Sequence, residues 1–135
     1  FGLDILRRQA KKVSVGDLGL IEELIITKSW WDTVDGLASW ICGPYFQKFP
    51  EKTKSITGAW AVSENMWLRR TSILFQLGYK DKTNSEILIN HIEKNLGSDE
   101  FFINKATKNS SEYTLVSNKS VSQIRILSAL LANLF

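Results

Sequence analysis

The segment that decides the fold reads WWDTVDGLASWI over residues 30–41. Its apolar residues return at spacings of three and four, which is the period of an α-helix that turns by about 100° per residue. They form a single stripe, made by Trp30, Val34, Leu37, Ala38 and Ile41. The pattern predicts a helix from about Trp30 to Ile41 that buries this stripe against its neighbours.

Similar spacing continues on both sides of this segment, so helices are expected along the whole chain. Gly43 and Pro44 are expected to interrupt the helix that contains the segment, although Pro44 could start another turn that carries Tyr45 and Phe46. Ser14 and Asp17 form a capping box ahead of the second helix, and Gly78 is expected to end a later one. The other predicted helices cover residues 1–13, 15–26, 52–60, 63–77, 84–96, 99–108 and 120–135.

The order of these elements predicts the fold class. No segment shows sustained alternation of apolar and polar residues, so no strands are expected. Short helices joined by short loops favour an all-α protein of stacked antiparallel helix pairs, a HEAT-like α-solenoid. A compact helical bundle is the alternative that this spacing leaves open.

Length and composition describe one domain, residues 1–135, with 44% hydrophobic and 23% charged residues. No apolar run approaches the roughly 18–20 residues that a membrane span needs, so no membrane association is expected. Phe1 lies inside a helical pattern without a capping residue before it, so we expect a fragment that is incomplete at its N-terminus.

Cysteine occurs once, which excludes an intrachain disulfide framework and a thiolate zinc site. The single His91 has no nearby cysteine or histidine, so zinc-hydrolase motifs and Ser-His-Asp triads lack most of their parts. We therefore expect no metal and no cofactor. Cys42 is expected to be a small buried residue, and His91 is expected at the surface.

The chain is mildly basic, with 17 lysine and arginine residues against 14 acidic ones. The excess lies entirely in residues 1–82, because residues 83–135 carry five residues of each sign. Such a balance permits a polyanionic partner without requiring one.

Trp31 and Asp35 are neighbours at helical spacing, on a face that the apolar stripe leaves free. A tryptophan beside a solvent-facing carboxylate is unusual and suggests a site. The alternative is that Trp31 packs against an adjacent helix pair and Asp35 forms a local contact. Because Asp35 lies outside the stripe, its replacement by Asn is expected to leave the fold intact.

Arg70 lies within the apolar arc of its predicted helix, beside Met66, Ile73 and Leu74. A guanidinium does not lose its proton in a protein, so it needs an anion or a solvated cleft there. Three anions remain open as its partner: a glutamate of a neighbouring helix, Asp35 or a phosphate.

Three stretches of this sequence resemble the signature of one family. They are TKSWWDTVDGLA at residues 27–38, WLRRTSILFQL at residues 67–77 and EFFINKA at residues 100–106. Together they make the chain similar, over residues 1–106, to the DNA alkylation repair enzyme family of HEAT-like DNA glycosylases. The resemblance implies base excision of cationic alkylated purines, such as 3-methyladenine and 7-methylguanine, by hydrolysis of the N-glycosidic bond in duplex DNA.

The resemblance also implies roles for individual residues. Asp35 matches the catalytic aspartate of the family, Trp31 matches its catalytic tryptophan and Arg70 matches its DNA-contacting arginine. Lys28 and Arg69 are expected to help bind DNA. The expected partner is double-stranded DNA with alkylated bases, bound by a monomer in the cytoplasm, at the nucleoid if the source is bacterial.

Two departures from the family pattern leave a second function open. The first helical repeats of the family precede Phe1, and Asn109 stands where the family has a further functional tryptophan. The alternative is a catalytically impaired HEAT-like module that binds DNA or protein.

Overall fold

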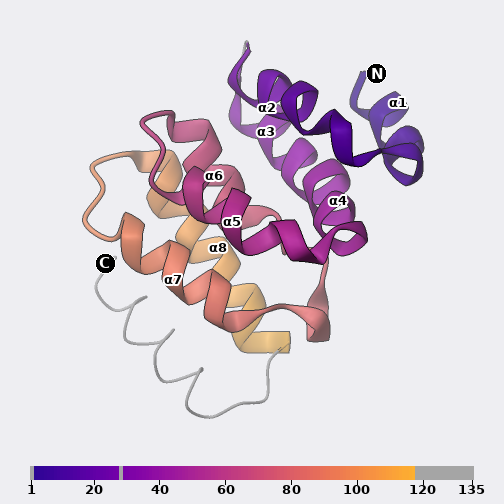
Figure 1. Cartoon of the computed structure of the whole chain (residues 1–135). Helices are drawn as coiled ribbons and strands as arrows, with labels where there is room; N and C mark the ends of the chain where they lie inside the picture. Colours follow the sequence, from indigo (N-terminus) through magenta and orange to yellow (C-terminus); the bar gives the residue numbers. More distant parts are fainter. Residues whose placement is uncertain (1, 28, 118–135) are drawn as a thin grey trace.

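The computed structural model describes residues 2–27 and 29–117, which are mainly helical and contain no strand (Figure 1). The predicted all-α class is therefore confirmed. Lys28 and the helix predicted over residues 120–135 lie outside the described residues. The α-helices are α1 (Gly2–Gln9), α2 (Leu18–Ile26), α3 (Trp31–Leu37), α4 (Gly43–Lys48), α5 (Pro50–Ala61), α6 (Met66–Leu74), α7 (Ser85–Asn95) and α8 (Phe101–Ser117).

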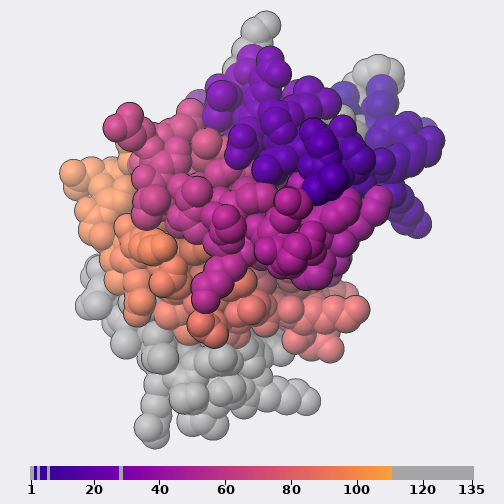
Figure 2. Space-filling model, viewed as in Figure 1, coloured from indigo at the N-terminus to yellow at the C-terminus, as the bar shows by residue number. Residues whose placement is uncertain are grey.

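The helices stack in chain order, from α1 at one end of the described chain to α7 and α8 at the other (Figure 1). Figure 2 shows the same order on the molecular surface, with the N-terminal residues and the α7 residues at opposite ends. Helix α6 lies at the centre and packs against α3, α5, α7 and α8. Its residues from Arg70 to Leu74 are all buried, so α6 joins the neighbouring helix pairs. Among the described residues, no helix has the length and apolar character needed to cross a bilayer.

Capping side chains set where these helices begin. The predicted capping box is confirmed: the Ser14 amide donates to the Asp17 carboxylate at 2.7 Å, and this bond lowers the pKa of Asp17. Asn65 caps α6 by accepting bonds from the amides of Trp67 and Leu68. Helix α6 therefore begins at Met66, later than the predicted start at residue 63.

A new α-helix, α4, begins at Gly43 with Pro44 in its first turn, which confirms the alternative expectation, but the predicted break in the helical path is wrong. A π-helical turn, Ala38–Cys42, connects α3 directly to α4. Proline lacks an amide hydrogen, and its ring would collide with the carbonyl four residues earlier in a regular α-helix. The wider turn, in which the Gly43 amide bonds to the Ala38 carbonyl five residues back, accommodates Pro44 without a break.

Gly43 lies in close contact with the residues that follow α6. A Cβ atom on Gly43 would lie 2.8 Å from the Phe75 carbonyl oxygen, and the Tyr79 hydroxyl donates to the Gly43 carbonyl at 2.6 Å. We expect Gly43→Ala to lower the free energy of unfolding by about 1–3 kcal/mol, measured by urea denaturation. Gly58→Ala in α5, where a Cβ meets no atom within 4 Å, should raise it by about 0.5–1 kcal/mol. Equal effects of the two changes would show that the close contact with the Phe75 carbonyl is not what requires glycine at position 43.

The core confirms the predicted stripe except at its first residue. Val34, Leu37, Ala38 and Ile41 are buried, as is Cys42. Trp30 instead precedes α3 with an extended backbone, which takes its side chain off the stripe and leaves the residue 54% exposed.

The expectation that His91 lies at the surface is wrong. The residue is 2% exposed, on α7, and its ring contacts Thr57 of α5 and the Ser72 carbonyl of α6. Hydrogen-bond partners inside the protein let this polar ring replace the apolar residue that a helix–helix contact otherwise favours.

Candidate active site

Helix α3 presents Trp31 and Asp35 beside its buried stripe. Burial of Val34 and Leu37 sets the rotation of the helix about its axis. Trp31 consequently remains 42% exposed, and the Asp35 side chain remains 29% exposed. Both residues therefore lie on the face that the sequence predicted to be free of the core.

Arg70 of α6 forms a bidentate ion pair with Asp35. Its Nε donates to Oδ1 and its Nη2 to Oδ2, each at 2.7 Å. Its Nη1 donates to the Phe102 carbonyl oxygen at the start of α8. With its side chain only 1% exposed, Arg70 is a buried counterion below a partly exposed carboxylate. Of the three anions left open by the sequence, the structure selects Asp35.

This geometry fixes the position of the carboxylate. Two parallel N–H···O bonds constrain both oxygens of Asp35, because a planar guanidinium matches the plane of a carboxylate. Each carboxylate oxygen has two lone pairs, so each retains acceptor capacity after its bond to Arg70. The exposed edge of Asp35 is thus an oriented, ionised acceptor.

An aromatic ring lies beside the ion pair and packs against two further rings. The Phe102 ring centroid lies 5.9 Å from the Arg70 guanidinium carbon. The same ring packs against Trp30 and Trp67 at centroid distances of 5.7 and 5.5 Å. Residues far apart in the sequence, from the residue before α3 and from α6 and α8, therefore build one aromatic wall beside the guanidinium.

A lysine of α8 lies over two exposed rings of this cluster. The Lys105 Nζ is 5.8 Å from the Trp31 ring centroid and 5.9 Å from that of Phe101. Both distances are within the range in which an aromatic face attracts a cation. The site thus combines an ionised carboxylate with π faces that accept positive charge.

Lys28 is not among the described residues, and the described hydrogen bonds of Arg69 go elsewhere than to this cluster. Arg69 donates from Nη1 to the carbonyls of Ser63 and Glu64, in the loop before α6, at 2.8 and 3.2 Å. Asn109 lies on α8, which continues beyond its predicted end at residue 108 to Ser117. Within residues 2–27 and 29–117, no group of three or more histidine, cysteine or acidic residues is placed to hold a metal ion.

Phe102 and Lys105 were not predicted as site residues. Both occur in EFFINKA, one of the stretches that carry the family resemblance, but no role was assigned to either. The spacing of Phe101 and Lys105 is the available signal, because residues four apart on a helix lie next to each other.

The fold and this cluster define a class of all-α protein in which stacked helices hold a carboxylate–guanidinium pair beside exposed aromatic side chains. A family model described as DNA alkylation repair enzyme matches residues 1–110, and the chain belongs to this family. The resemblance stated from the sequence is therefore confirmed.

A solved structure supports the same family. The predicted DNA alkylation repair enzyme from Enterococcus faecalis is 25% identical in sequence and superposes with a TM-score of 0.81. The alignment covers 96% of this chain and 58% of that structure, so this chain spans little more than half of its length. No curated protein matches the chain in sequence.

Proposed function

We propose that the cluster around Asp35 is the active site of a DNA glycosylase that hydrolyses the N-glycosidic bond of cationic alkylated purines in duplex DNA. The observation that carries this proposal is the ionised, partly exposed carboxylate that Arg70 orients beside aromatic rings. Membership of the DNA alkylation repair enzyme family supports an enzyme that acts in DNA repair.

The chemistry of the substrate matches these groups. A ring-alkylated purine already carries a positive charge and leaves readily, so the main demand is to stabilise positive charge that develops on the deoxyribose. A fixed carboxylate meets this demand without reorganisation at the moment of reaction. Asp35 would stabilise the sugar cation and, through its free lone pairs, orient the attacking water.

Trp31 would bind the cationic nucleotide. Its exposed indole face attracts positive charge, and the Lys105 ammonium occupies such a position in the free chain. DNA phosphates would draw Lys105 away from the ring and leave the face to the substrate.

Arg70 would act first by positioning Asp35. A phosphate contact, which the family resemblance implies for Arg70, would require the ion pair to open, because the guanidinium is 1% exposed in the free chain. That contact therefore remains a proposal that can be tested separately from the positioning role.

Duplex DNA is the proposed partner, reached through the basic half of the chain, and a bacterial protein of this kind would act in the cytoplasm at the nucleoid. Lys28→Gln should weaken binding similarly for all sequences and reduce the slope of log affinity against log salt by about 0.9, the value for one lost phosphate contact. Fluorescence anisotropy at several salt concentrations measures both effects. Lys52→Gln on α5 makes the same charge change, and an equal loss of slope there would contradict a local role of Lys28.

The direct test is release of 3-methyladenine and 7-methylguanine from methylated duplex DNA. Release that depends on Asp35 supports the glycosylase. DNA binding without release supports the impaired module, which the presence of Asn109 at the family's tryptophan position favours. In that case Asn109→Trp is the rescue variant, and a gain in base release would restore the enzyme interpretation.

A further inference from the structure

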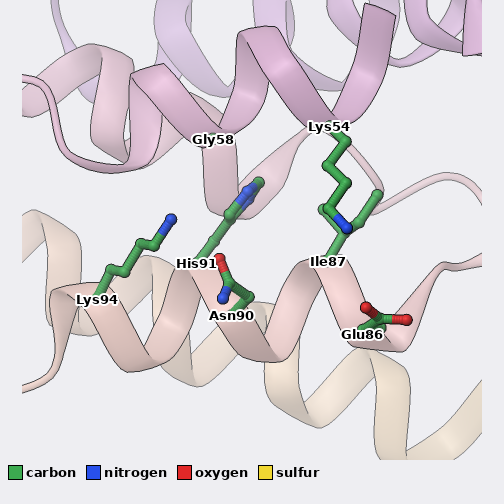
Figure 3. A pocket seen from close by; sticks show the side chains of 7 residues that line it. All are labelled: Lys54, Gly58, Glu86, Ile87, Asn90, His91 and Lys94. Carbon is green, nitrogen blue, oxygen red and sulfur yellow. The ribbon is translucent and has the colours of Figure 1, made fainter. Parts of the chain in front are cut away.

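A cavity of about 260 Å³ lies between α5 and α7, whereas the Asp35 cluster is built by α3, α6 and α8. Figure 3 shows Lys54 of α5 and Lys94 of α7 on either side of His91. The polar residues that line the cavity are Lys54, Glu86, Asn90, His91 and Lys94.

The hydrogen bonds of His91 leave one ring nitrogen without a donor. Its Nδ1 lies 2.9 Å from the Ser72 carbonyl oxygen, which only accepts, so Nδ1 carries a hydrogen. Its Nε2 lies 3.5 Å from the Thr57 hydroxyl, whose hydrogen is already donated to the Thr53 carbonyl at 2.7 Å. When the ring is neutral, Nε2 is therefore a buried acceptor that none of these groups satisfies. When the ring is protonated, Nε2–H can donate to the Thr57 oxygen.

The protein surroundings by themselves oppose this protonation. Burial lowers the pKa of His91, the bond to the Ser72 carbonyl raises it, and the charge of Lys94 lowers it further. The described charged side chains that line the cavity are Lys54 from α5, with Glu86 and Lys94 from α7. An anion between the two lysines would offset their repulsion of an imidazolium, so anion binding and protonation of His91 would favour each other.

We propose that this cavity binds a phosphate group between Lys54 and Lys94, with the Asn90 amide as a further donor, and that binding is linked to protonation of His91. Two ammonium groups and an imidazolium suit an anion of more than one charge better than a carboxylate. At roughly 30 Å³ per water molecule the cavity exceeds the needs of a single small ion, which leaves room for the group that carries the phosphate.

Nuclear magnetic resonance of the imidazole tests this proposal directly, because His91 is the only histidine in the chain. The whole chain is titrated with acid in chloride and in inorganic phosphate at matched ionic strength. Phosphate should raise the pKa of His91 by about 0.5–1 unit, as expected for a nearby opposite charge. Identical titrations in the two buffers would overturn the proposal.

Matched variants locate the effect. The exposed lysines Lys54 and Lys94 can be changed together to Gln, which should abolish the phosphate-dependent shift and raise the pKa of His91 in chloride. Lys11→Gln with Lys12→Gln makes the same charge change in the turn after α1, at residues that do not line the cavity, and should preserve the shift. Equal shifts in the two double variants would show that phosphate acts elsewhere and would overturn the proposal.

A second series of titrations identifies the source of the phosphate. If an undamaged DNA duplex raises the pKa of His91 in the parent but not in the Lys54/Lys94 variant, the ligand is a nucleic-acid backbone. If inorganic phosphate alone does so, the ligand is a small phosphate compound. Failure of both probes overturns the proposal and leaves base release at Asp35 unaffected, because no residue is shared between the two sites.

Discussion

Asp35→Asn is expected to reduce the release of alkylated bases by about 10²–10³-fold, the loss expected when one fixed electrostatic stabiliser is removed. The amide keeps the size of the side chain but removes the negative charge opposite the developing sugar cation. Affinity for undamaged DNA should hold or rise slightly, because the change also removes a negative charge near the backbone. Single-turnover base release and binding by anisotropy measure the two effects.

The same change should also destabilise the protein. The sequence suggested that the fold would tolerate it, but the structure shows that Asp35 neutralises a buried guanidinium. Asn retains one acceptor oxygen and loses the charge, so we expect the free energy of unfolding to fall by about 1–3 kcal/mol. Base release therefore has to be measured at a temperature where the variant is folded, as judged by circular dichroism.

Asp32→Asn is the matched control. Asp32 lies in the first turn of the same helix, is exposed, and accepts a bond from the Thr33 amide at 2.7 Å. Its neutralisation makes the same charge change and should leave base release within a few-fold of the parent. A catalytic role of Asp35 would be refuted if its variant lost base release only in proportion to the unfolded fraction.

Arg70→Met should have the largest effect on stability. It removes the hydrogen bonds to both Asp35 oxygens and to the Phe102 carbonyl. Removing one partner of a buried ion pair costs about 3–5 kcal/mol. Because Asp35 keeps access to water, we expect a loss shifted below this range, about 2–4 kcal/mol, measured by urea denaturation.

Two further variants separate positioning from DNA contact. Arg70→Lys keeps the charge but loses the planar fork, so it should recover only part of the stability and of the base release. As a comparison, Arg69→Met removes bonds to two loop carbonyls and should lower the free energy of unfolding by about 1 kcal/mol.

The salt dependence of DNA binding tests whether Arg70 also contacts DNA. If Arg70 only positions Asp35, this dependence should be unchanged in Arg70→Lys and in folded Arg70→Met. If the slope of log affinity against log salt falls by about 0.9 in Arg70→Met but not in Arg70→Lys, Arg70 contacts a phosphate directly.

Local patterns in the sequence determined the helical class and the faces of the helices. The stripe of Val34, Leu37 and Ile41 placed Trp31 and Asp35 on a free face, because residues on one α-helix keep a constant angular relation. The same helical spacing identified Arg70 as a charged residue on an apolar face, where it needs an anion. The capping box at Ser14 was also predictable, since it depends on residues three apart.

Only the tertiary structure decided what came together from distant segments. It selected Asp35 from the possible partners of Arg70, and it brought Lys105 of α8 over Trp31 of α3. It also buried His91, whose hydrogen-bond partners come from α5 and α6. Each of these contacts depends on how helices pack and on the path of the chain between them. Helical periodicity determines which face of a helix is apolar, but the side chains that meet that face are chosen by packing between helices.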